Sequence, residues 1–100
     1  MRFEIVLAPH AVVSLKQLSA FVRAKVKDAL ETHLRHEPRR LSKSRIKRLR
    51  GLNRPQYRLR VNDIRVFYDV TDKEVQIVAI VTKEEADGWL SAFGESAPEP

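Results

Sequence analysis

The sequence contains no cysteine and only one tryptophan and one methionine among its 100 residues. Without cysteine the chain can form no disulfide, bind no zinc through sulfur and use no thiol nucleophile. It also lacks an apolar run near the roughly 20 residues that a bilayer-spanning helix requires. Residues 1–7 are too short and too acidic for the apolar region of a signal peptide. We therefore expect a cytoplasmic protein that makes no contact with a membrane.

Histidine is scarce as well, and the few nucleophilic side chains lack partners. His33 and His36 have the i, i+3 spacing of a metal pair, but no third ligand stands near them in the sequence. Ser42 and Ser44 lie among cations without a histidine or an aspartate beside them. We therefore expect no metal ion, no other cofactor and no serine nucleophile.

Positive charge is abundant and unevenly distributed. The formal net charge is +6, and residues 35–65 alone hold twelve lysines and arginines against two acids. From residue 84 to the end there are five acids and no lysine or arginine. Such a basic block suits a polyanion, of which the phosphate backbone of nucleic acid is the commonest in a cell. The alternative is a solvated basic loop.

Periodicity predicts one α+β domain over residues 1–93, followed by a flexible tail over 94–100. Apolar alternation predicts a first strand at 3–7, and helical spacing predicts two helices, the second capped by Ser19 and stopped by Pro38. After a loop and a short strand at 47–49, further strands and a last helix follow at 56–61, 64–70, 75–81 and 84–93. The order β-α-α-β-β-β-α predicts a mainly antiparallel four-stranded sheet with a helical hairpin on one face.

Three arginines lie on two neighbouring predicted strands. Alternation directs Arg58 and Arg60 to the same side, and a two-residue turn at 62–63 brings Arg65 close to them. The register, which the sequence does not fix, decides whether Arg65 shares their face. Convergent guanidinium groups repel one another, so their convergence would indicate a bound anion. The alternative is that each arginine pairs with an acid or extends into water.

An ordered set of motifs resembles the RelE/ParE toxin superfamily. The segments RLRGL at 48–52, YRLRV at 57–61 and IRVFYDV at 64–70 are similar to its basic-Leu-x-Gly element and its two arginine-bearing strands. The preceding helical hairpin and the apolar strand at 75–81 continue the resemblance, which covers residues 2–93. The resemblance implies the RelE-like microbial RNase fold.

The resemblance also implies a function and a set of site residues. Members of the RelE branch are endoribonucleases with cationic catalytic groups, which correspond here to Arg58, Arg60 and Arg65. Members of the ParE branch inhibit DNA gyrase. The chain departs from the RelE pattern in its last segment: Lys83 is the only base, and no arginine or tyrosine follows it.

The departure matters because cleavage of RNA without a metal needs both charge stabilisation and proton transfer. Attack of the 2′-OH on phosphorus forms a phosphorane, whose extra negative charge arginine stabilises by bidentate contact. Arginine stays protonated and is a poor base, whereas a lysine among cations can serve. Lys83 is therefore the candidate for proton transfer, ahead of Lys47, Tyr57 and Tyr68. Both tyrosines are better placed in the core.

The sequence thus predicts a metal-independent, mRNA-cleaving toxin that acts at the ribosome and inhibits translation. Its partners would be mRNA, the ribosome and a cognate antitoxin protein, and it would meet DNA only indirectly, through the antitoxin. The alternatives are a gyrase inhibitor and a non-catalytic RNA-binding member of the family. The side chains expected to bind the RNA backbone are Lys43, Arg45, Lys47, Arg48, Arg50 and Arg54.

Overall fold

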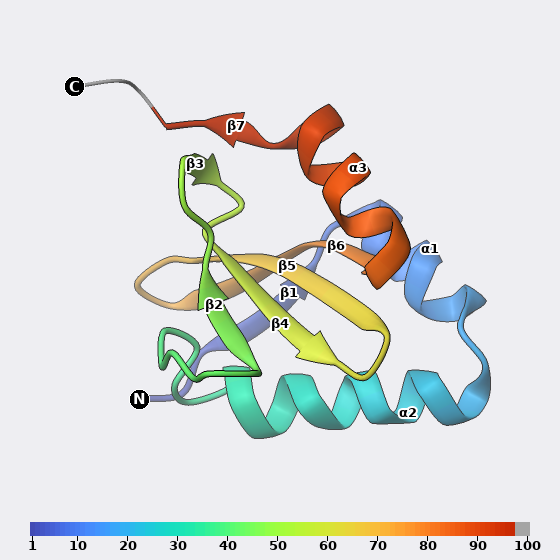
Figure 1. Ribbon diagram of the computed structural model, residues 1–100. Helices are drawn as coiled ribbons and strands as arrows, with labels where there is room; N and C mark the ends of the chain where they lie inside the picture. The colour runs from blue at the N-terminus through green and yellow to red at the C-terminus, as the bar shows by residue number, and fades with distance from the viewer. Residues whose placement is uncertain (98–100) are drawn as a thin grey trace.

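A mixed sheet with the order β1-β6-β5-β4-β2 forms the centre of the computed structural model, which describes residues 1–97 (Figure 1). β1 runs parallel to β6, and the other neighbouring strands are antiparallel. The α+β class is therefore confirmed. The strands are β1 (Glu4–Leu7), β2 (Ile46–Arg48), β4 (Tyr57–Val61), β5 (Ile64–Val70) and β6 (Glu74–Thr82).

Over the described residues this sheet has five strands, where the sequence predicts four. The fifth strand is β2, which corresponds to the short strand expected at 47–49 but begins one residue earlier, and it pairs with β4 so that Ile46 lies opposite Leu59. A segment of three residues has too little alternation to show that it joins the main sheet. Ile46 is buried, and its contribution to the core explains why this short segment is held against β4.

Helices α1 (Pro9–Gln17) and α2 (Ala20–Ala29), with the π-helical turn η1 (Leu30–Leu34), cover one face of the sheet. The side chain of Ser19 accepts a hydrogen bond from the backbone of Val22, which confirms the predicted cap of α2. Apolar side chains from these helices join those of the sheet in the main core. The core members from the helices are Ala11, Leu15, Val26, Leu30 and Leu34.

Helix α3 (Lys83–Phe93) lies on the opposite side of the sheet from α2 (Figure 1). It begins with a capping box in which Thr82 and Glu85 exchange hydrogen bonds. Its Trp89 stacks on Phe67 of β5, with ring centroids 5.4 Å apart. It packs against β5 and β6 and covers only part of this second face.

A second, two-stranded sheet joins the end of the chain to the segment before β4. β3 (Leu52–Arg54) pairs with β7 (Glu95–Ser96), although the sequence predicts a flexible tail from residue 94. Residues 98–100 of that predicted tail lie outside the described part of the chain. Among residues 1–97, no helix has the length and the apolar character needed to cross a bilayer.

Candidate functional site

The two-residue turn at 62–63 places the three arginines on one face of the sheet. Asn62 adopts a left-handed conformation with φ 52°, and Val61 lies opposite Ile64. This register sets Arg60 directly opposite Arg65, and alternation along β4 puts Arg58 on the same side. The same pairing rule brings in Lys47, which lies opposite Arg58 on β2. We call Lys47, Arg58, Arg60 and Arg65 the cationic face.

Arg58 has an unusual environment for a guanidinium group. It is half-buried, and its Nε atom is buried without a hydrogen-bond partner within residues 1–97. Burial lowers the pKa of Arg58, and the nearby charges of Arg65 and Arg60 lower it further. Such an arrangement costs stability unless an anion completes it.

Arg65 is held in place by the turn that precedes it. Its Nη1 atom donates hydrogen bonds to the backbone oxygens of Asn62, at 2.8 Å, and Ile64, at 3.1 Å. Arg60 is exposed and lies beside it in the register. The cationic face therefore combines a fixed, a half-buried and an exposed guanidinium group, which together can surround one phosphate.

Lys83 lies at the margin of this face, at the first position of α3. Its backbone N–H donates to Asp63, and its Nζ atom lies 3.4 Å from the carboxylate of the same residue. The turn between β4 and β5 thus fixes the start of α3 close to Arg65. Lys83 and Asp63 are both exposed, so a bound ligand could displace this contact at little cost.

The tyrosines lie on the other side of the sheet. Tyr68 is fully buried, donates a hydrogen bond to the carbonyl oxygen of Pro38 and stacks against Tyr57. Burial raises the pKa of the Tyr68 hydroxyl far above its usual range. Both side chains belong to the core or pack against it, as predicted, and neither reaches the cationic face.

The residues predicted to bind the RNA backbone are not gathered on one surface. Arg54 forms a 3.0 Å ion pair with the buried carboxylate of Asp69, which raises the pKa of Arg54. Arg48 donates to the backbone oxygens of Leu49 and Gln56 and lies over the ring of Tyr57. Both therefore contribute to the fold. Lys47 lies on the cationic face, while Lys43, Arg45 and Arg50 are exposed outside it.

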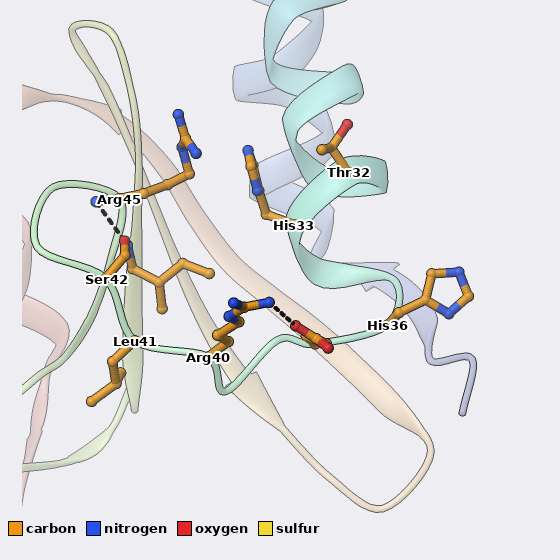
Figure 2. A pocket seen from close by; sticks show the side chains of 9 residues that line it. Thr32, His33, His36, Arg40, Leu41, Ser42 and Arg45 are labelled. Atoms are coloured by element: carbon orange, nitrogen blue, oxygen red, sulfur yellow. Dashed lines mark hydrogen bonds and ion pairs between the residues drawn. The ribbon is translucent and has the colours of Figure 1, made fainter.

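A hollow that no sequence pattern predicts lies on the helical side of the molecule, as Figure 2 shows. It measures about 360 Å³ and lies between η1 and the segment that leads into β2. His33 and Arg45 point toward one another from these two walls. No local pattern predicts that His33 and Arg45 line the same hollow, because only the packing of α2 against the sheet brings them together. Within residues 1–97, no group of three potential metal ligands is found.

Comparisons with known proteins agree with this architecture. The family model for the ParE toxin of the type II toxin–antitoxin system parDE matches residues 5–86. The RelB–RelE antitoxin–toxin complex of Methanococcus jannaschii contains a similar chain, with a TM-score of 0.64, 19% identity, and coverage of 84% of this chain and 96% of that one. A chain of the RelE–RelB complex of Pyrococcus horikoshii OT3 has a TM-score of 0.63 and 26% identity over 83% of this chain and 97% of that one. No curated protein matches the sequence significantly.

Proposed function

This chain belongs to the ParE toxin family, within the RelE/ParE superfamily of type II toxins, and from the chemistry of its cationic face we propose that it inhibits translation by cleaving mRNA. The cationic face would hold the scissile phosphate. The observation that carries the proposal is the convergence of Arg58, Arg60 and Arg65 around a buried Nε atom without a partner. A phosphate group supplies the negative charge and the acceptor oxygens that this cluster lacks.

The proposed reaction is an internal transesterification. The 2′-oxygen forms a bond to phosphorus while the bond from phosphorus to the 5′-oxygen breaks, which leaves a 2′,3′-cyclic phosphate and a 5′-hydroxyl end. Arg65 and Arg58 would stabilise the added charge of the phosphorane. Lys83, at the margin of the face, would transfer the proton between the 2′-hydroxyl and the departing 5′-oxygen, since arginine stays protonated.

The proposed partners follow from the relatives and from the chemistry. Both similar solved structures are toxin–antitoxin complexes, which supports a cognate antitoxin protein as the partner that controls this chain. Cleavage of mRNA at the ribosome would place its action in the cytoplasm. The ribosome would present a single strand whose phosphates are accessible to the open part of the cationic face.

Inhibition of DNA gyrase is the second candidate function. It is favoured by the match to the ParE family model. It is also favoured by the scarcity of groups that could transfer a proton, since Lys83 is the only lysine or arginine after β6. A gyrase inhibitor needs a protein-binding surface but no general base. A non-catalytic RNA-binding role would use the same cationic face without chemistry.

Cleavage assays on the full chain separate these functions. End-labelled mRNA is incubated with the protein, with and without ribosomes, and a gyrase supercoiling assay is run in parallel. We expect 2′,3′-cyclic phosphate ends from the wild type. The Arg65→Ala variant should lose about 3 kcal/mol of transition-state stabilisation, or more than a hundredfold in rate, with little change in RNA binding.

Lys73→Ala is the matched control, because Lys73 is an exposed cation in the turn before β6, far along the strand from Arg65. It should cleave like the wild type. Inhibition of supercoiling without any RNA cleavage would overturn the nuclease proposal in favour of the gyrase function. Binding of RNA with neither activity would indicate the non-catalytic role.

A further inference from the structure

A second hollow opens where the cationic face meets the helical side of the molecule. It has a volume of about 440 Å³ and lies between α2 and the ends of β4 and of the segment before β2. We call it the α2 hollow. Its charged and ionisable lining residues are Lys25, Asp28, His33, Arg45 and Arg60.

Arg60 belongs to both surfaces. It lies opposite Arg65 on the cationic face, and it also lines the α2 hollow together with Arg45. The backbone N–H of Arg60 donates to the carbonyl oxygen of Arg45, so the two residues are neighbours across the sheet. Arg60 therefore links the cationic face to the lining of the α2 hollow, which also contains Arg45.

The positive charge of the hollow exceeds its negative charge. Three cations, Lys25, Arg45 and Arg60, and one acid, Asp28, line it, and the ammonium of Lys25 lies 5.0 Å from the centroid of the Phe21 ring. The ion pairs found among residues 1–97 use other groups, and none includes these three cations. An electropositive hollow of this size can hold a phosphate group and its sugar, and the low dielectric of its walls strengthens the attraction.

We propose that the α2 hollow is a second phosphate-binding site, which takes the backbone of the RNA strand whose scissile phosphate lies on the cationic face. This inference rests on the proposed nuclease function and adds the direction in which the strand leaves the site. The strand passes from Arg65 over Arg60 to Arg45 and Lys25. Its contacts there are with phosphates, so the hollow contributes affinity and position but no sequence preference.

His33 gives the site a dependence on pH. It is half-buried between the α2 hollow and the hollow of Figure 2, and Arg45 points toward it. Burial lowers the pKa of His33, the charge of Arg45 lowers it further, and Asp28 opposes them. The other charged groups that line these two hollows are Lys25, Arg60, His36 and the ion pair of Arg40 with Glu37.

A phosphate bound between His33 and Arg45 favours the protonated imidazole, because it adds a negative charge beside the ring. Binding therefore takes up a proton. The affinity for RNA should rise as the pH falls from 8 to 6, and this rise should be absent from a His33→Gln variant. The ring proton signals of His33 in NMR spectra report its protonation directly, without reference to cleavage.

The main test compares strands of two lengths on the full chain. Fully 2′-O-methylated RNA is used, because it has no nucleophile and cannot be cleaved. A dinucleotide occupies the cationic face alone, whereas an octanucleotide can also reach the α2 hollow. In the variant with Lys25→Gln and Arg45→Gln, the octanucleotide should bind about tenfold more weakly, and the salt slope of log K should fall by about 0.7 for each lost phosphate contact.

Binding of the dinucleotide should not change in this variant. Lys27→Gln is the control, since Lys27 is an exposed cation on the same helix and does not line the hollow. Equal binding of the octanucleotide by the variant and the wild type would overturn the inference. The inference would also be overturned if inorganic phosphate competed with the octanucleotide as strongly as RNA does. The hollow would then be a site for small anions.

These outcomes are distinguishable from failure of the nuclease proposal. If the chain is a gyrase inhibitor, Arg65→Ala leaves RNA ends unchanged and neither strand length binds tightly. If only the α2 hollow is assigned wrongly, the cleavage and its loss in Arg65→Ala remain, and the double variant binds the octanucleotide like the wild type.

Discussion

Single residues have different proposed roles, and proton transfer by Lys83, at the margin of the cationic face, is the role that is most easily separated from binding. Lys83→Arg keeps a positive charge next to Asp63 but replaces a group that can exchange protons by one that cannot. If Lys83 transfers the proton, the variant should bind RNA normally and cleave it about 10² to 10⁴ times more slowly. Single-turnover cleavage with saturating RNA measures this step apart from binding.

Full activity in Lys83→Arg would contradict this role and leave Lys83 as an electrostatic contact. Lys83→Gln provides the complementary control, because it also removes the charge. A variant pair in which only the glutamine form is impaired would assign Lys83 to phosphate binding. Lys47, which lies opposite Arg58, would then be the next residue to examine for proton transfer.

The sequence could identify the arginines of the site but could not separate them from arginines that support the fold. Arg58 and Arg60 share a side by alternation alone, and the two-residue turn then fixes Arg65 opposite Arg60. Arg54 has the same charge and lies in the same basic block, yet it is bound to Asp69, fifteen residues away. The carboxylate of Asp69 also accepts a hydrogen bond from the backbone of Gln56. Only the folded chain reveals such a pairing.

At the level of elements, long periodic segments could be predicted together with their place in the sheet, whereas of the short strands only β2 was expected, at 47–49. The alternation of β4 and β5 and the apolar run of β6 give clear signals over five to nine residues. β2 and β3 have three residues each, and β7 has two. Their positions depend on partners that are distant in the sequence. Burial of Ile46 holds β2, and the approach of the chain end to Leu52 holds β3 against β7.

Gly88, inside α3, and Gly94, at the C-terminal end of α3, offer a paired test of how the end of this helix packs against β3. A methyl group at Gly88, inside the helix, would meet no atom within 4 Å, whereas one at Gly94 would lie 2.6 Å from the carbonyl oxygen of Leu90 and 3.2 Å from the side chain of Leu52. We expect Gly88→Ala to stabilise the protein by about 0.5–1 kcal/mol, because alanine has the higher helix propensity. Gly94→Ala should destabilise it by about 1–3 kcal/mol, because either the helix end or β3 must move.

Thermal unfolding of the two variants measures the difference. For a domain of this size, about 1 kcal/mol corresponds to about 4–8 °C in Tm, so the two variants should shift Tm in opposite directions. Equal stability of Gly94→Ala and the wild type would mean that the contact of the chain end with Leu52 is loose in solution. The cleavage rate should not change in Gly88→Ala, since Gly88 is exposed and has no contact with the cationic face.

Across the whole molecule, the uneven distribution of positive and negative charge would determine the side from which the proposed RNA substrate approaches. Residues 35–65 hold twelve cations and two acids. Helix α3, at the margin of the cationic face, carries the acids Glu84, Glu85 and Asp87. A polyanion is therefore attracted toward the sheet and away from the exposed side of α3. This polarity agrees with a strand that leaves the cationic face by way of Arg60 rather than across the helix.

The salt dependence of binding tests this polarity and the choice between RNA and a protein target. If the scissile phosphate and the phosphates beside it release four counterions on binding to the cationic face, log K should fall with log salt at a slope of about −2.8, which is about 50-fold between 50 and 200 mM. Occupation of the α2 hollow makes the slope steeper. The variant with Lys47→Gln and Arg60→Gln should bind more weakly at low salt and lose about 1.4 from the slope.

The matched control replaces Lys16 and Lys27, two exposed cations of the helical layer outside the cationic face and the α2 hollow. Replacing both by glutamine removes the same net charge, so a general effect of charge would change the slope as much as the face variant does. A specific strand on the sheet leaves the control close to the wild type. A flat response of the wild type between low and physiological salt would contradict phosphate binding altogether, because an interface with a protein such as gyrase does not release the counterions of a nucleic acid.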